Sequence, residues 1–459
     1  MARTFDPIEL ELLWRRLISM VDEAAAAMVR TSFSTLVRES YDFSCVITDA
    51  AGQSLVQASE SIPSFIGTLP ETVKHFLRFY PPDQLAPGDV LITNDIWLGT
   101  GHLPDITLAK PIFRDGRLVA FSATTAHAPD IGGKIRSPEP REVFEEGLQI
   151  PPMKMIVAGK TDETLVAIIR KNVRTPDQTM GDLWAQVVAL DLMEDRLRVL
   201  MESYGLPDLT DLAREIQGRC EAAMRAAIRA LPDGTYHSAL ETDGLMETPI
   251  TMKMALTIKG DEIEMDFAGT DGQVDRAINC ALCYTNAMAM YGVKVCTSPN
   301  LPNNEGAWRP ITLKAPEGSI VNPQFPAPGG SRMLIGHYVP MLVFGCLGQI
   351  VPERVMAACG SPMWGMNQSG VRDDGRGGGK PYANMFFYNG GMGGNGQRDG
   401  VTTLSWPSNV SSTAIEISEH IAPLRFHHKK LRPDSGGPGR HRGGLGQEIL
   451  LESLSETPI

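Results

Sequence analysis

The pattern His-x-Pro-Asp-Ile occurs twice, at 102–106 and 127–131, in a chain of 459 residues that contains nine histidines. Between the two copies lie two apolar, strand-like runs, ITLAKPIF and LVAFSATTA, on either side of Asp115-Gly116. An Asp-Gly pair between such runs is a strong short-range signal for a β-hairpin. The sequence therefore predicts a hairpin whose open end carries both copies of the motif.

The register of this hairpin decides which motif residues meet. Counting back from a two-residue loop places Pro104 opposite His127 and Asp105 opposite Ala126. Each motif proline has a fixed φ and no N–H, so it bends the chain out of the ladder and redirects the neighbouring side chains. We therefore expect the two motifs to meet at one end of the hairpin.

Two imidazoles and one or two carboxylates then converge, from His102, Asp105, His127 and Asp130. Two histidines and a carboxylate leave coordination positions open, as in catalytic zinc sites and non-haem iron enzymes. The alternative is that each copy is a turn in which Asp caps backbone N–H groups and His packs locally. Because the motif is repeated across one hairpin, the pattern favours a metal site, and it leaves the identity of the metal open.

Helical and strand-like periods follow one another along the chain. The periodicity predicts a helix from Asp6 onward, a shorter helix near 70–80, and two long amphipathic helices within 161–231 that fold into a helical hairpin. After residue 231 the period changes to that of strands. These patterns predict an α+β protein, with a helical N-terminal portion (1–231) that carries the metal-site hairpin and a β-rich portion (232–459) with glycine-rich loops.

The composition is that of an ordinary globular protein, with 42% hydrophobic and 21% charged residues. The formal net charge of −12 disfavours nucleic-acid binding, which depends on neutralising phosphates. The first residues lack the basic and apolar regions of a secretory signal, and no apolar run reaches the roughly 20 residues that span a bilayer. We expect a cytoplasmic protein with no nucleic-acid or membrane partner.

Other short motifs are weak. Cys280-x-x-Cys283 has no second pair, which favours buried thiols over a zinc ribbon or a redox site. Segment 391–396 matches G-x-G-x-x-G without a βαβ setting, and GRGGGKP at 375–381 has Pro where a phosphate loop needs Ser or Thr. The sequence therefore does not indicate a Walker-type nucleotide site. It also has no G-x-S-x-G, so it does not indicate a nucleophilic serine.

Two further segments combine glycine with aromatic or basic residues. Residues 360–400 surround the aromatic run YANMFFY with glycines, which favours an ordered functional loop over a linker. The basic stretch 425–444 fits an anion site with Arg440 or Arg442 as donors, and it fits a solvated or subunit-facing surface equally well.

Taken in order, several longer segments resemble the hydantoinase B/oxoprolinase family, which includes B subunits of ATP-dependent hydantoinases and is related to the large subunits of acetone-type carboxylases. The resemblance runs from one end of the chain to the other. It is carried by RESYDFSCVITD, PGDVLITNDIWLGTGHLPDITLAKPIF, TTAHAPDIGG, EEGLQIPPMK, GGMGGNGQRDG and LRPDSGGPGRHRGGLG.

The resemblance implies a metal-bearing subunit that works beside a separate, ATP-binding subunit of the hydantoinase A type. It implies further that the partner activates a cyclic amide by phosphorylation, and that the B-type subunit opens the ring with water activated by zinc, manganese or iron. The family's metal ligands carry over to Asp42, His102, Asp105 and His127, and Asp42 rests on the resemblance alone. We assign proton transfer or orientation of the ligands to Asp130 and Glu146.

The function expected from these residues is metal-dependent opening of a small cyclic amide, such as a hydantoin or a 5-oxoproline-like lactam. A subunit of an acetone-type carboxylase is the second reading, since the same motifs serve both. A catalytically silent scaffold for the A-type subunit is the third. The chain ends at SLSETPI soon after Gly446, so its C-terminal portion is expected to be short for the family.

Overall fold

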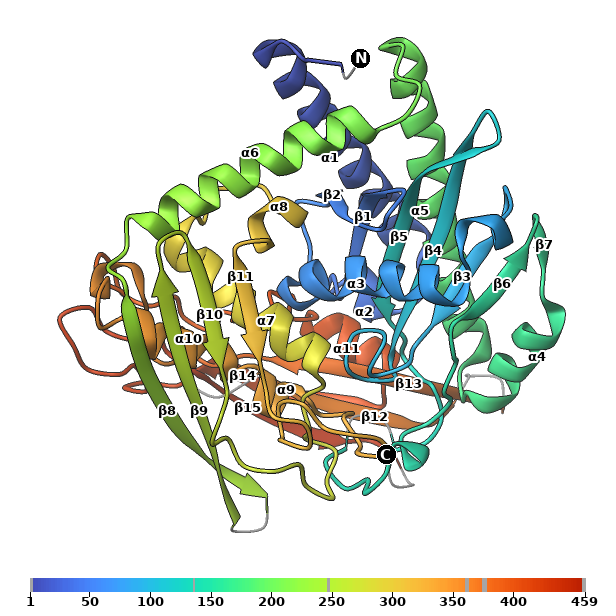
Figure 1. Ribbon diagram of the computed structural model, residues 1–459. Coiled ribbons are helices and arrows are strands. Elements are labelled where there is room, and N and C mark those ends of the chain that lie inside the picture. Colours follow the sequence, from blue (N-terminus) through green and yellow to red (C-terminus); the bar gives the residue numbers. More distant parts are fainter. Residues whose placement is uncertain (1–2, 135–136, 246–247, 360–362, 374–377, 456–459) are drawn as a thin grey trace.

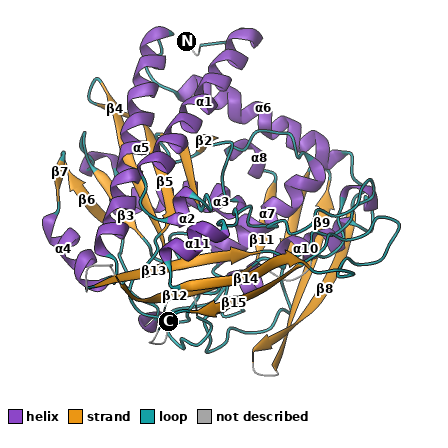
Figure 2. Ribbon diagram, turned by 180° about the vertical axis from the view of Figure 1, so that it is seen from behind, coloured by secondary structure: helices purple, strands orange, loops and turns teal. Residues whose placement is uncertain are grey.

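The computed structural model describes residues 3–134, 137–245, 248–359, 363–373 and 378–455. It is a mixed α+β structure, as the sequence predicts, in which long helices pack on several β-sheets (Figures 1 and 2). No helix in this part of the chain is both long enough and apolar enough to cross a membrane.

The helices are α1 Pro7–Thr31, α2 Thr35–Arg38, α3 Pro63–Phe79, α4 Glu163–Asn172, α5 Pro176–Ser203, α6 Thr210–Arg229, α7 Leu282–Thr297, α8 Glu305–Trp308, α9 Met333–Gly336, α10 Val339–Leu347 and α11 Ile415–Ile421. The strands are β1 Phe43–Asp49, β2 Ser54–Gln57, β3 Val90–Thr93, β4 Asp105–Arg114, β5 Arg117–His127, β6 Met153–Val157, β7 Lys160–Thr161, β8 Gly234–Leu245, β9 Thr248–Lys259, β10 Glu262–Asp266, β11 Ile311–Lys314, β12 Trp364–Asp373, β13 Gly379–Tyr388, β14 Leu424–Leu431 and β15 Gln447–Ser453.

The first sheet has seven strands in the order β2-β1-β5-β4-β3-β6-β7. Helices α1 and α5 pack together and contribute to the main core on one side of it, while α3 packs against β1 and β5 in a separate apolar cluster. Because helices cover both faces, β1 and β5 are buried along almost their whole length. The β4–β5 hairpin is therefore held rigidly at the centre of this layer.

The second sheet has four strands in the order β11-β10-β9-β8 and packs with α7 and α10 around a second core. Helix α6 reaches both cores, because Ile216 lies in the first and Met224 and Ile228 lie in the second. The predicted helical hairpin of α5 and α6 is therefore wrong. Helix α5 packs against α1 and β5, whereas α6 turns away to pack against α8 and β10 (Figure 1).

The glycine-rich segment after residue 360 contains an antiparallel strand pair, β12–β13, and the basic stretch begins with β14, which pairs with β15. Both pairs cross the lower half of the molecule as seen in Figure 2. The run YANMFFY is almost wholly buried in β13, which explains why an aromatic insert interrupts the glycines. Residues 360–362 and 374–377 lie outside the described part of the chain, so the GRGGGKP segment is described only from Gly378 onward.

Two local predictions need correction. Helix α3 begins at Pro63, not near residue 70, and Pro70 lies inside it. Its early turns are stabilised by tertiary packing: a side-chain Cβ at Gly67 would lie 2.8 Å from Ala287 of α7, so the two helices approach closely there. Apolar tertiary contact of this kind outweighs the helix-breaking tendency of a single proline.

The register of the β4–β5 hairpin also differs from the prediction. Asp115 and Gly116 form the turn, with φ of 50° and 74°. A bulge between Ile112 and Phe113 shifts the pairing, so Asp105 lies opposite His127 and not opposite Ala126. The extra residue in one strand moves every pair beyond it by one position. The consequence is that a motif carboxylate, not a proline, faces the second motif histidine.

Candidate metal centre

Three motif side chains meet where the β4–β5 hairpin opens. Asp105 Oδ1 lies 2.8 Å from His102 Nε2 and 2.8 Å from His127 Nδ1. The possible ligand atoms of the three residues all lie within 4.8 Å of one another, and each side chain is at most 2% exposed. The structure thus brings together three of the residues that the repeat singles out.

The backbone explains this convergence. Asp105 and His127 are register partners at the ends of β4 and β5, while His102 lies in the loop that leads into β4. Gly101 has φ of +96°, and a Cβ there would lie 2.8 Å from the Arg332 side chain. A left-handed residue without a side chain lets the loop turn His102 back toward the strand ends.

The other carboxylate oxygen of Asp105 is held by two donors. Arg332 Nη2 donates to Oδ2 over 2.8 Å, and Thr100 Oγ1 donates to the same oxygen over 2.7 Å. Burial alone would raise the pKa of Asp105, but the Arg332 guanidinium and the hydrogen bond with His127 hold that pKa well below its usual range. Asp105 is therefore an oriented carboxylate with Oδ1 directed at the histidines.

The hydrogen bonding of His102 identifies its free lone pair. Its Nδ1 lies 3.2 Å from the Gly330 carbonyl oxygen, which can only accept, so Nδ1 carries the proton and Nε2 carries the lone pair. Burial, with a smaller effect of Arg332, lowers the pKa of His102 to about 3, which keeps the ring neutral. Nε2 is buried and makes no hydrogen bond, although Asp105 Oδ1 is 2.8 Å away.

A lone pair and a carboxylate oxygen this close repel each other unless a cation lies beside both. Imidazole nitrogen and carboxylate oxygen are the ligands that zinc, manganese and iron accept. A neutral imidazole nitrogen without a hydrogen bond, next to an ionised carboxylate, is thus the donor arrangement that a divalent metal ion requires. The residues present fit such an ion.

Asp42, assigned from the family resemblance, is placed beside this group. Asp42 is 7% exposed and lines the same cavity as His102, Asp105 and His127. Strand β1 pairs with β5 so that Phe43 faces Ala126, and the Asp42 carbonyl oxygen accepts from His127 N over 3.1 Å. This pairing joins strands 70 and more residues apart, so the hairpin pattern could not reveal it.

Glu146 reaches the site through one intermediate loop. Its carboxylate accepts from Gly330 N over 2.6 Å and from Gly329 N over 3.2 Å, and Gly330 is the residue whose carbonyl holds His102. Burial raises the pKa of Glu146 to about 7, although the two N–H groups oppose that shift. Glu146 therefore positions the loop that orients His102.

Asp130 follows the second motif but turns away from the three-residue group. Its Oδ1 accepts from Arg174 Nη1 over 2.7 Å and from Gly132 N over 3.0 Å, and its other oxygen accepts from Arg174 N. It is not among the residues that line the cavity around His102. Asp130 fixes the loop after β5 to the start of α5.

The cavity at the centre is small, about 30 Å³, and sequence reasoning missed part of its wall. Tyr284, Arg332 and His337 line it from the C-terminal half, and the Arg332 guanidinium stacks 4.1 Å from the Tyr284 ring centroid. These residues come from α7, from the residue that caps α9 and from the turn after it. No short-range pattern marks them, because their partners lie far away in the sequence.

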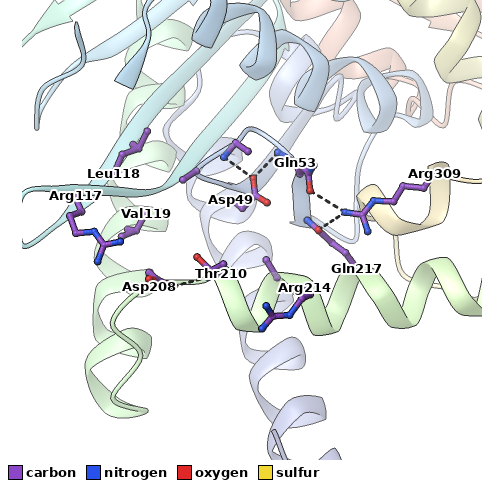
Figure 3. Close-up of a pocket in the computed structure, with 13 residues that line it drawn as sticks. Asp49, Gln53, Arg117, Leu118, Val119, Asp208, Thr210, Arg214, Gln217 and Arg309 are labelled. Carbon is purple, nitrogen blue, oxygen red and sulfur yellow. Dashed lines mark hydrogen bonds between the residues drawn. The ribbon is translucent and has the colours of Figure 1, made fainter. Parts of the chain in front are cut away.

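Among the residues that the structure describes, the larger cavities gather no other set of three metal-ligating side chains. One of about 480 Å³ lies between the β1–β2 turn, the start of β5 and α6 (Figure 3). In it Arg309 donates to Gln53 and Gln217 over 3.0 and 2.8 Å, and Asp49 accepts from two turn N–H groups. Arg309 and Asp49 thus already have hydrogen-bond partners within this cavity. Cys280 and Cys283 are free thiols, and burial raises the pKa of each to about 12. Cys280 is buried, as predicted, whereas Cys283 is only partly buried.

The family model for hydantoinase B/oxoprolinase matches residues 6–458. The chain belongs to this family. The β subunit of caprolactamase from Pseudomonas jessenii is 30% identical over 99% of this chain and 79% of its own length. 5-Oxoprolinase 1 of Arabidopsis thaliana is 27% identical over 99% of this chain and 37% of its own length.

Two solved structures share the fold. The crystal structure of the ATP-dependent caprolactamase from Pseudomonas jessenii superposes with a TM-score of 0.89 at 28% identity, over 98% of this chain and 79% of that chain. A nucleotide-free acetone carboxylase structure also gives a TM-score of 0.89, at 20% identity, over 97% of this chain and 62% of that chain. At that identity the second likeness concerns the fold alone.

Proposed function

We propose that this chain is the metal-dependent hydrolytic subunit of an ATP-dependent hydantoinase or oxoprolinase, opening a small cyclic amide that an A-type subunit has activated. The observation that carries the proposal is the orphaned Nε2 of His102 beside the ionised Asp105. Asp42, His102, Asp105 and His127 would hold the ion. The names of the family and of the caprolactamase relative support a cyclic amide as substrate.

A divalent ion supplies Lewis acidity there, which makes water a better nucleophile and a carbonyl a better electrophile. The chain's own residues set the conditions for this. Arg332 and Thr100 hold Asp105 ionised and oriented, and Gly330 fixes the His102 tautomer. The apolar side chains of Ile62, Phe65 and Met333 line the same cavity and exclude bulk water.

Asp130 and Glu146 enter the proposal as positioning residues, since each acts through another group. Glu146 orients the Gly329-Gly330 loop behind His102, and Asp130 anchors the loop that follows His127. Groups behind metal ligands commonly change metal affinity or activity 10- to 100-fold when they are replaced.

We assign ATP use to the partner. The sequence has no Walker-type phosphate loop, and the caprolactamase relative is described as a β subunit of an ATP-dependent enzyme. The proposal therefore needs a hydantoinase A-type subunit in a hetero-oligomer, with ATP consumed there.

Elemental analysis of the purified chain tests the site directly. The His102→Ala/His127→Ala double variant is compared with the natural chain and with a His427→Ala/His428→Ala control, which removes two more exposed histidines from β14. We expect about one zinc, manganese or iron per chain in the natural and control proteins and none in the site variant. If none of the three retains metal after divalent ions are added back, the scaffold reading takes the place of this proposal.

Activity separates the two enzymatic readings. With an A-type partner and ATP, the proposal predicts ring opening of hydantoin, 5-oxoproline or a simple lactam, lost in the site variant while circular dichroism stays unchanged. Carboxylation of a ketone with bicarbonate, in place of ring opening, would show that the chain is instead an acetone-type carboxylase subunit.

A further inference from the structure

Lys294 is a buried basic residue that lies apart from the metal centre. It belongs to α7 and is 6% exposed. It lines a cavity of about 170 Å³ between the first turns of α3, the C-terminal half of α7 and the segment that leads into α8. Figure 1 shows α3 and α7 side by side with α8 above them, and α3 and α7 are in contact.

The ammonium group of Lys294 has no hydrogen bond or ion pair with the residues that the structure describes. Two other partly buried lysines, Lys74 and Lys110, are paired with carboxylates. Lys74 Nζ lies 2.6 and 2.7 Å from two glutamates, and Lys110 Nζ lies within 2.7 Å of an aspartate and a glutamate. An unpaired buried charge is costly, so Lys294 differs from Lys74 and Lys110 in lacking a carboxylate partner among the described residues.

The electrostatics agree with this contrast. Burial lowers the pKa of Lys294 to about 8, offset only in part by the Cys220 thiol, whereas their carboxylate partners raise the pKa of Lys74 and Lys110 in spite of burial. Within the described part of the chain, the Lys294 ammonium group therefore lacks the carboxylate counter-charge that stabilises Lys74 and Lys110.

The cavity walls define what could supply that counter-charge. Ile66, Met290, Tyr291 and Trp308 form apolar and aromatic walls, and Asn303 adds an amide. The volume is close to that of a cavity of about 150 Å³ that binds benzene. A ligand of that size with one anionic end would place its charge on Lys294 and its apolar body against the aromatic walls.

We propose that this cavity is a binding site for a small monocarboxylate of about the size of benzoate, whose carboxylate pairs with Lys294 Nζ and whose apolar body packs between Trp308 and Met290. The site shares no lining residue with the metal centre, so it is independent of the proposed function. Its ligand would act as a second, non-reacting molecule.

Isothermal titration of benzoate into the full chain tests the proposal. Benzamide serves as the neutral ligand of the same shape. The Lys294→Met variant removes the charge and keeps nearly the same side-chain length. The Lys259→Met variant is the control, because it removes a lysine that is exposed. We expect one benzoate per chain, bound at least tenfold more tightly than benzamide, with at least a tenfold loss in Lys294→Met and none in Lys259→Met. Lys294→Met should melt no lower than the natural chain, because it removes an unpaired buried charge.

Equal binding of benzoate to Lys294→Met, or no binding to the natural chain, would overturn the proposal and make Lys294 a lysine whose stem packs along α7 while its head reaches water. If Lys294→Met does not fold, Asn303→Asp replaces it, since this change places a carboxylate in the same cavity. Loss of benzoate binding in Asn303→Asp supports the site, and unchanged binding overturns it.

Discussion

Arg332 and Asp105 lie 227 positions apart in the sequence, yet the Arg332 guanidinium donates to Asp105 Oδ2 over 2.8 Å in the interior. The arginine belongs to the C-terminal half, and the aspartate belongs to the β4–β5 hairpin of the N-terminal half. The candidate metal centre is therefore complete only when both halves pack together.

Replacing Arg332 should destabilise the metal-free protein strongly. In Arg332→Leu the Asp105 carboxylate keeps its burial and loses its charge partner, which costs about 3–5 kcal/mol. Arg332→Lys keeps a positive charge and should lose less. Urea unfolding in the presence of a chelator measures both. Equal free energies of unfolding for the two variants would contradict a role for charge in this pair.

Thr100→Val should weaken metal binding without unfolding the chain. The variant loses the hydroxyl that donates to Asp105 Oδ2, so the carboxylate is less firmly oriented, and we expect affinity to fall about 10- to 100-fold. Competition with a chromophoric chelator measures it. Thr107→Val is the matched control, because Thr107 is equally buried in β4 and bonds to Thr125; a similar loss there would refute the orienting role.

Two glycines with positive φ provide a second matched pair. Gly101→Ala and Gly116→Ala both place a side chain on left-handed backbone, at a cost of roughly 1–2 kcal/mol. At Gly116 the new Cβ meets nothing within 4 Å, whereas at Gly101 it lies 2.8 Å from Arg332. We expect similar strain in both and loss of metal only in Gly101→Ala, measured as metal content. Retention of metal by Gly101→Ala would show that the loop adapts.

Glu146 should make stability depend on pH. Burial raises its pKa from the ordinary 4.5 to about 7 in the folded protein, so the folded state binds the proton more tightly than the unfolded state does. The contribution is fully present below pH 4.5 and is lost as pH rises toward 7. Melting temperatures between pH 5 and 8 should fall more steeply for the natural chain than for Glu146→Gln, and parallel curves would contradict the shift.

Local sequence signals were sufficient for part of the centre. The Asp-Gly turn and the repeated His-x-Pro-Asp predict a hairpin that carries His102, Asp105 and His127 to one end, and the structure brings these three together. The predicted register was one residue off because a bulge depends on packing beyond the turn. The α5–α6 hairpin was wrong for a related reason, since amphipathic periodicity shows that a helix has an apolar face but not which partner covers it.

The sequence by itself determined the α+β class, the family and the residues that two adjoining strands bring together, because turn chemistry and alternation act over a few residues. Only the tertiary structure decided that Asp42 lines the cavity, that Arg332 donates to one oxygen of Asp105 and that Glu146 holds the loop behind His102. It also decided that Lys294 lines a cavity with no carboxylate among its described lining residues. These contacts join residues that lie far apart in the sequence and belong to no common helical or strand periodicity. They arise where two separately built cores meet, and there burial makes each charge depend on which distant partner packs beside it.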